Sequence, residues 1–175
     1  MAFDLSSAVR LRIGASVAGL FLLASTLCHA QVEDVALKAA FIYNFALFTT
    51  WPPTLTAATS FNVCVAPGSP LGDSLRRLGG KSINGKPWTV REMPADVRKG
   101  DCDVAVLGKA SQPLSLSSPG TTLVIRDGGI AGKNGAAITL VTEDNHVHFD
   151  IDTAEAERNG LRFSSKLLSL ARNVL

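Results

Sequence analysis

Val104-Ala105-Val106-Leu107 is a continuous apolar run, and such a run is typical of a β-strand covered on both faces. Before it in the chain, Phe61–Val65 is a short β-rich run, Leu71–Leu78 predicts a short amphipathic helix, and Trp88–Met93 predicts another strand. The order strand, helix, strand, strand indicates the α/β class. We therefore expect one small domain with a mixed, partly parallel sheet and flanking helices.

The segments on either side extend this pattern. Apolar residues recur every three or four positions over Glu33–Phe48, which predicts a helix that Trp51-Pro52-Pro53 ends. Thr122–Arg126 predicts a strand, and Ala137–Thr142 with Val147–Ile151 predicts a hairpin.

Two helices are expected after the hairpin. Asp152 or Thr153 can cap a helix that runs to Arg158. Ser164 can cap a last helix that continues to the final residue. Its predicted buried face consists of Leu167, Leu168, Ala171, Val174 and Leu175.

The first thirty residues have the composition of a secretory leader. Arg10 and Arg12 precede the apolar run Ile13–Leu27, and Cys28-His29-Ala30 follows it. The run is shorter than the roughly 20 residues that a membrane-spanning helix needs. We expect residues 1–30 to be a signal peptide cleaved after Ala30, and residues 31–175 to be a single exported periplasmic domain.

The charges of the chain nearly balance, with 17 Lys and Arg against 15 Asp and Glu. This balance gives no electrostatic reason to expect a nucleic acid or an anionic membrane as partner.

Cys64 and Cys102 remain after cleavage, and an oxidising compartment favours a disulfide between them. The alternative is a pair of buried free thiols, which are common in strands. The spacing is not that of a Cys-x-x-Cys thiol oxidoreductase.

Asp144, His146, His148, Asp150 and Asp152 alternate along the chain and could supply metal ligands on one face of a strand. The simpler interpretation is that Val147, Phe149 and Ile151 face the core while this polar set faces water.

The glycine-rich stretch 128–135 departs from a phosphate-binding loop, because Asn134 stands at the hydroxyl position and a strand follows. No nucleophile motif is present. We expect no catalytic residue, metal or cofactor.

Aromatic residues at the end of the first helix are the remaining feature. Tyr43, Phe48 and Trp51 lie where the apolar stripe is wider than one small core can cover, so they are candidates for a partner interface. The alternative is that these aromatic residues simply fill the core.

The segments in this order resemble the YfiR family of periplasmic proteins. The most specific blocks open and close the domain: Lys38-Ala39-Ala40-Phe41-Ile42-Tyr43-Asn44-Phe45 with Trp51-Pro52, and Gly160-Leu161-Arg162-Phe163-Ser164-Ser165-Lys166-Leu167-Leu168. Ile83-Asn84-Gly85-Lys86-Pro87 and Asp101-Cys102-Asp103-Val104 match between them. Asp152 departs from the family, which usually has asparagine there.

The resemblance implies a non-enzymatic repressor of an inner-membrane diguanylate cyclase. It would bind the cyclase's periplasmic sensory domain and so lower cyclic di-GMP, which governs biofilm formation. It also implies a homodimer, relief by an outer-membrane lipoprotein or by reduction, and a bond between Cys64 and Cys102. Two other functions remain open: a receptor for a small ligand near Pro67-Gly68-Ser69 or the glycine-rich loop, and a metal hydrolase built on His146 and His148.

Overall fold

A computed structural model describes residues 25–53, 59–95, 97, 100–111, 121–133 and 135–175, with side chains from residue 34 onward. The chain divides into two compact units, residues 1–34 and 35–175, and the fold described below is that of the second. Residues 1–24 of the expected leader lie outside the described residues, so cleavage after Ala30 stays a prediction.

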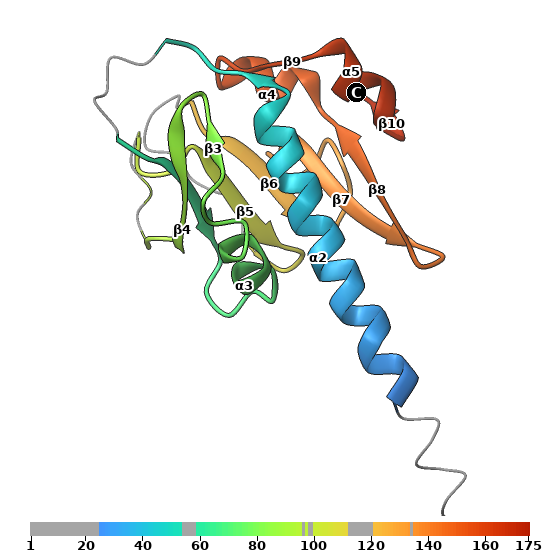
Figure 1. The fold of residues 1–175 in the computed structure, drawn as a ribbon. Coiled ribbons are helices and arrows are strands. Elements are labelled where there is room, and N and C mark those ends of the chain that lie inside the picture. The colour runs from blue at the N-terminus through green and yellow to red at the C-terminus, as the bar shows by residue number, and fades with distance from the viewer. Residues whose placement is uncertain (1–24, 54–58, 96, 98–99, 112–120, 134) are drawn as a thin grey trace, which may run out of the picture. The chain divides into compact units, whose positions relative to one another are not determined.

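Four helices and ten strands make up the described chain (Figure 1). The helices are α2 (Ser25–Leu47), α3 (Leu71–Arg76), α4 (Thr153–Arg158) and α5 (Ser165–Leu170). The first five strands are β1 (Thr49–Thr50), β2 (Phe61–Val65), β3 (Ser82–Ile83), β4 (Lys86–Glu92) and β5 (Val104–Gly108). The others are β6 (Leu123–Asp127), β7 (Ile138–Glu143), β8 (His146–Ile151), β9 (Arg162–Phe163) and β10 (Asn173–Val174).

The main sheet has eight strands in the order β10-β8-β7-β6-β5-β2-β4-β3. The central strands β4, β2, β5, β6 and β7 are parallel, whereas the β3–β4 and β7–β8 hairpins are antiparallel. This arrangement confirms the α/β class and the mixed, mostly parallel sheet. The apolar run Val104–Leu107 lies at the centre, between β2 and β6, and is buried throughout.

Local sequence signals account for the turns and caps. Asn84 and Gly85 have φ values of 49° and 78°, and Asp144 and Asn145 have values of 48° and 62°, so both tight hairpins use the left-handed region that these residues tolerate. The Asp152 side chain accepts a hydrogen bond from the Glu155 N–H, as expected of a helix cap. The departure from the family's asparagine therefore leaves the cap intact.

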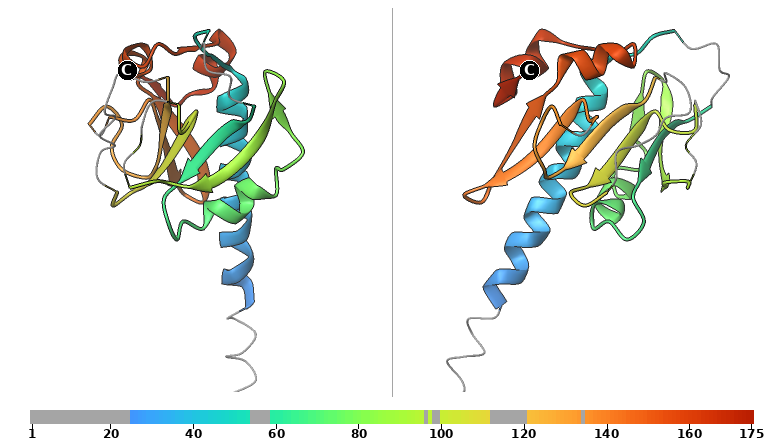
Figure 2. Two further views of the ribbon diagram at one scale, coloured as in Figure 1. Left: turned by 90° about the vertical axis from the view of Figure 1, so that its left-hand side faces the viewer. Right: turned by 180° about the vertical axis from the view of Figure 1, so that it is seen from behind.

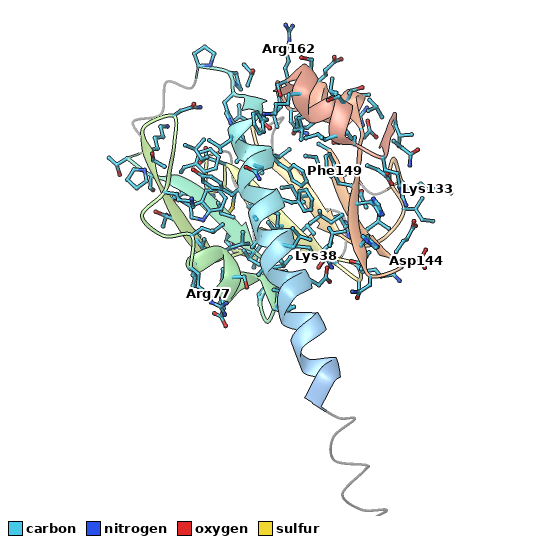
Figure 3. The ribbon with its side chains drawn as sticks, turned by 45° about the vertical axis from the view of Figure 1, so that its right-hand side comes forward. Lys38, Arg77, Lys133, Asp144, Phe149 and Arg162 are labelled. Atoms are coloured by element: carbon cyan, nitrogen blue, oxygen red, sulfur yellow. A yellow bond between two sulfur atoms is a disulfide. The ribbon has the colours of Figure 1, made fainter. Side chains whose placement is uncertain are left out.

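Helix α2 covers one face of the sheet. Its residues Ala39, Ile42 and Phe45 are buried with the strand residues of that face in one core cluster. Phe149 of β8 packs beneath the helix, with ring centroids 4.8 Å from Phe45 and 5.8 Å from Phe41 (Figure 3). Lys38 forms an ion pair of 3.0 Å with Asp127 at the end of β6. The helix is thus held by burial on one side and by an ion pair at the end of the central strand β6.

The opposite face carries the disulfide. Among the described elements no helix crosses this face, as the view from behind in Figure 2 shows. The buried residues of this face form two small clusters. One contains Cys64, Val97 and Cys102, and the other contains Leu107, Val124 and Ala136. Arg126 is also buried there, and its Nη1 donates to the carbonyl oxygens of Gly108 and Ser111 at 3.0 and 2.8 Å.

The predicted last helix is wrong beyond Leu170. Ser164 caps α5 as expected, and Leu167 is buried, but the chain then becomes extended at Ala171 and adds β10 to the sheet edge, parallel to β8. Val174 and Leu175 are 49% and 55% exposed rather than buried. Backbone hydrogen bonds from Arg172 to Phe149 and from Leu175 to Ile151 replace those of the helix.

The predicted water-facing row on β8 is wrong at Asp150, which is only 4% exposed. Arg172 forms two hydrogen bonds with this carboxylate, and Asn173 adds a third. A carboxylate with such partners can be buried at a tolerable free-energy cost. The same contacts direct the chain after α5 along β8 and so explain why the last helix ends early.

Candidate functional site

The structure joins Cys64 and Cys102 in a disulfide. Cys64 lies in β2 and Cys102 just before β5, with Cα atoms 5.7 Å apart and 38 positions apart in sequence. Their exposed fractions are 0% and 2%, and Val97 and Met93 pack around them. A dissolved reductant therefore reaches the bond only when this face of the sheet opens.

Asp103 and Asn62 connect the same two strands immediately beside the disulfide. The Asn62 N–H donates to Asp103 Oδ2 at 2.7 Å, and the Asp103 N–H donates to the Asn62 carbonyl at 2.8 Å. Burial raises the pKa of Asp103 above its ordinary value, and the Asn62 hydrogen bond and the charges of Lys86 and Arg91 oppose this only in part. Asp103 is thus a partly desolvated carboxyl group that the fold stabilises incompletely.

The three candidate interface residues are all half-buried and pack on the core. Tyr43 meets the edge of Trp88 at 5.2 Å and donates its hydroxyl to the Ser82 carbonyl. Trp51 meets Phe61 at 5.2 Å.

Phe48 has different neighbours, since the Lys166 ammonium lies 5.2 Å from its ring centroid. The structure therefore brings Tyr43 and Trp51 into one aromatic row that also contains Phe61 and Trp88, and it places Phe48 beside α5. Their role in binding a partner stays a prediction.

Sequence reasoning did not single out the outward side of α2. Leu37 and Leu47 are 47% and 46% exposed, and Ala40 and Asn44 between them are exposed as well. These four residues, which we call the α2 stripe, follow each other at intervals of three, four and three, the spacing of a helix–helix seam. The signal was present in the excess width of the apolar pattern, but periodicity alone does not tell which half of it the core covers.

The histidines of β8 are exposed, with ring centroids 6.4 Å apart, and His146 Nδ1 lies 2.8 Å from the Asp144 carbonyl oxygen. Asp144 lies at the tip of the β7–β8 hairpin (Figure 3). Nowhere in the described part of the chain do three or more His, Cys, Asp or Glu side chains gather as a metal site would require. The glycine-rich stretch joins β6 to β7, so a strand rather than a helix follows it.

Two cavities lie at opposite ends of the parallel strands. One, of about 320 Å³, adjoins Gly68 and Ser69 after β2 and is lined mainly by polar groups such as Arg76 and Glu92. This is one of the places where a ligand pocket was expected. The other, of about 280 Å³, lies at the beginnings of β2, β5 and β6 and has an aromatic wall. Sequence reasoning missed this second cavity, because its lining residues are scattered from Trp51 to Thr121.

These features define a class: an α/β domain with a mostly parallel sheet, one long covering helix and a buried disulfide on the opposite face. A family model described as YfiR/HmsC-like matches residues 35–172, and the chain belongs to this family. Membership fits a periplasmic regulator rather than an enzyme. No curated protein matches the chain. Within the described residues, no helix has the length and apolarity to cross a membrane.

Proposed function

We propose that this chain is a periplasmic, non-enzymatic regulator that represses an inner-membrane diguanylate cyclase by binding its periplasmic sensory domain. The observation that carries the proposal is the YfiR/HmsC-like match over residues 35–172, which is nearly the whole expected mature domain. Repression of the cyclase lowers cyclic di-GMP, and an outer-membrane lipoprotein would compete for the regulator and so release the cyclase. Residues 1–30 are the leader that carries the chain across the inner membrane.

The surface of the domain supports action by contact. The α2 stripe leaves two leucines nearly half exposed on a helix whose other side is firmly packed. Exposed apolar side chains aligned on a rigid element are typical of protein interfaces. We propose that the α2 stripe pairs two copies in a homodimer, with Asn44 setting the register as a single polar residue does in helix seams. The aromatic end of α2, at Tyr43, Phe48 and Trp51, then remains available to the cyclase.

The buried disulfide supports a location in the periplasm, because disulfides persist in oxidising compartments. It ties β2 to the segment just before β5, on a face that no described helix covers. It would also make the regulator sensitive to reducing stress.

Binding to the sensory domain tests the proposal. The isolated periplasmic domain of each inner-membrane diguanylate cyclase of the source bacterium is titrated with the mature chain by calorimetry. We expect a stoichiometric complex, and Lys166→Glu, which places an anion beside Phe48, should weaken it. Lys133→Glu, a remote exposed charge reversal, is the matched control. Absence of heat and of co-elution with every periplasmic cyclase domain of that bacterium would refute the proposal.

A further inference from the structure

The cavity at the beginnings of β2, β5 and β6 combines an aromatic wall with two opposite charges. Trp51, Pro52 and Phe61 are among its apolar lining residues, and Lys86 and Asp103 are the charged residues that line it. Its volume of about 280 Å³ is at the lower limit of small-molecule sites, which begin near 300 Å³. A molecule that fills it is therefore small.

Within the described part of the chain, the two charges have fewer partners than they can bind. Asp103 uses Oδ2 to accept the Asn62 N–H, whereas Oδ1 accepts no hydrogen bond in the described part of the chain. Lys86 is near enough for its charge to act on Asp103, yet the two form no ion pair among the described residues. Arg91, the other nearby cation, is engaged with the Asn62 side chain at 2.8 Å. A bound molecule with a hydrogen-bond donor facing Asp103 and an acceptor facing Lys86 would give both side chains the partners they lack among the described residues.

This pattern selects the chemistry of the ligand. A simple amine would satisfy Asp103 but meet repulsion from Lys86, and a simple carboxylic acid would meet the reverse. A molecule with both an ammonium and a carboxylate satisfies both, and an apolar side chain on it can pack on the wall formed by Trp51 and Phe61.

We propose that the cavity lined by Trp51, Phe61, Lys86 and Asp103 binds a small zwitterion with an apolar body, of the size and chemistry of a free amino acid. The ammonium of the ligand pairs with Asp103 Oδ1 and its carboxylate with Lys86. The proposal does not rest on regulation of a cyclase, and it concerns a different cavity from the one beside Gly68 and Ser69.

Three probes of the same carbon skeleton test this inference: L-leucine, 3-methylbutylamine, which lacks the carboxylate, and 4-methylpentanoate, which lacks the ammonium. Affinities for the mature oxidised chain are measured by calorimetry at neutral pH. We expect saturable one-to-one binding of L-leucine, with each single-charge analogue weaker by about tenfold or more. The indole N–H resonance of Trp51 should shift on binding, whereas that of the buried Trp88 should change less.

Variants locate the binding. Lys86→Gln and Asp103→Asn should each weaken L-leucine about tenfold or more, while the exposed controls Lys109→Gln and Asp144→Asn leave it unchanged. Lys86, the first residue of β4, is only half-buried, so Lys86→Gln tests the site independently of the change in stability expected for Asp103→Asn. No L-leucine binding at millimolar concentration, equal affinity for the three probes, or binding unaffected by Lys86→Gln would overturn the inference.

Discussion

The carboxylate of Asp150 and the guanidinium of Arg172 form a two-pronged contact, with Nε 2.9 Å from Oδ1 and Nη2 2.6 Å from Oδ2. Arg172 also reaches Glu143 at 2.7 Å on the neighbouring strand of the hairpin. One residue near the C-terminus is therefore tied to both strands of the β7–β8 hairpin, and this contact fixes β10 at the sheet edge.

Asp150→Asn removes the charge while keeping the volume of the side chain. Burial alone would raise the pKa of Asp150, but hydrogen bonds from Arg172 and Asn173 outweigh it and lower that pKa below the ordinary value. We expect the variant to lose roughly 1.5–3 kcal/mol of unfolding free energy at neutral pH. Urea denaturation measures the loss, and Asp73→Asn, in the exposed pair with Arg76, is the control with little effect.

The pH dependence gives a second readout on Asp150. A lowered folded-state pKa stabilises the fold above the unfolded value of about 3.9, and this stability disappears as the pH falls through the folded pKa. The wild-type chain should therefore lose stability below about pH 4 more steeply than Asp150→Asn. Parallel acid curves for the two proteins would contradict the role of this contact.

The disulfide should dominate the stability of the central sheet. Because the bridge spans 38 positions, replacing Cys64 and Cys102 by alanine should cost roughly 3–4 kcal/mol. Thermal and urea unfolding should show the same loss of stability for the double variant and for the reduced wild-type chain.

In the source bacterium, Cys64→Ser should raise cyclic di-GMP. Unchanged levels with a properly exported variant would remove the redox part of the proposal.

Reduction of the disulfide should itself be slow under native conditions. Both sulfur-bearing residues are buried, so a thiol reductant must wait for local opening. With a thiol reductant present, the rate at which labelled thiols appear at Cys64 and Cys102 should be much higher in subdenaturing urea than in buffer. Equal rates would show that the bond is accessible in the native state.

Asp103→Asn should raise the thermal stability of the domain at neutral pH. The pKa of Asp103 is raised because burial disfavours the charged form, so ionisation destabilises the fold at neutral pH. This penalty shrinks as the pH falls through the raised pKa and is gone below the ordinary pKa of an aspartate. Asparagine can still accept the Asn62 N–H without carrying a charge. A calorimetric scan tests this, with Asp101→Asn as a neighbouring control. A lower midpoint for Asp103→Asn would indicate that the carboxylate stabilises the fold.

If the proposed homodimer forms through the α2 stripe, Leu37→Glu combined with Leu47→Glu should convert it into a folded monomer, because both side chains are nearly half exposed. Light scattering coupled to gel filtration reports the mass. Ile130→Glu, at an apolar residue that is 62% exposed outside α2, is the matched control and should leave the dimer intact. A dimer that survives the double variant would place self-association elsewhere.

Much of the fold could be predicted because its signals are local. The run Val104–Leu107, the hairpin turn at Asp144-Asn145, and the caps at Asp152 and Ser164 each act within a few residues. The C-terminus could not, because Arg172 meets Asp150 across 22 positions and no periodicity records that contact. The cavity with Lys86 and Asp103 was missed for the same reason, because residues far apart in the sequence, from Trp51 to Thr121, come together there.

The level of cyclic di-GMP in the source bacterium shows whether the exported chain represses a cyclase. The gene is deleted, and the strain is complemented with the full chain or with a version that begins with Met followed by residue 31. Deletion should raise cyclic di-GMP, the full chain should restore the low level, and the leaderless version, confined to the cytoplasm, should fail. Unchanged cyclic di-GMP on deletion, or full restoration by the leaderless version, would contradict repression by an exported regulator.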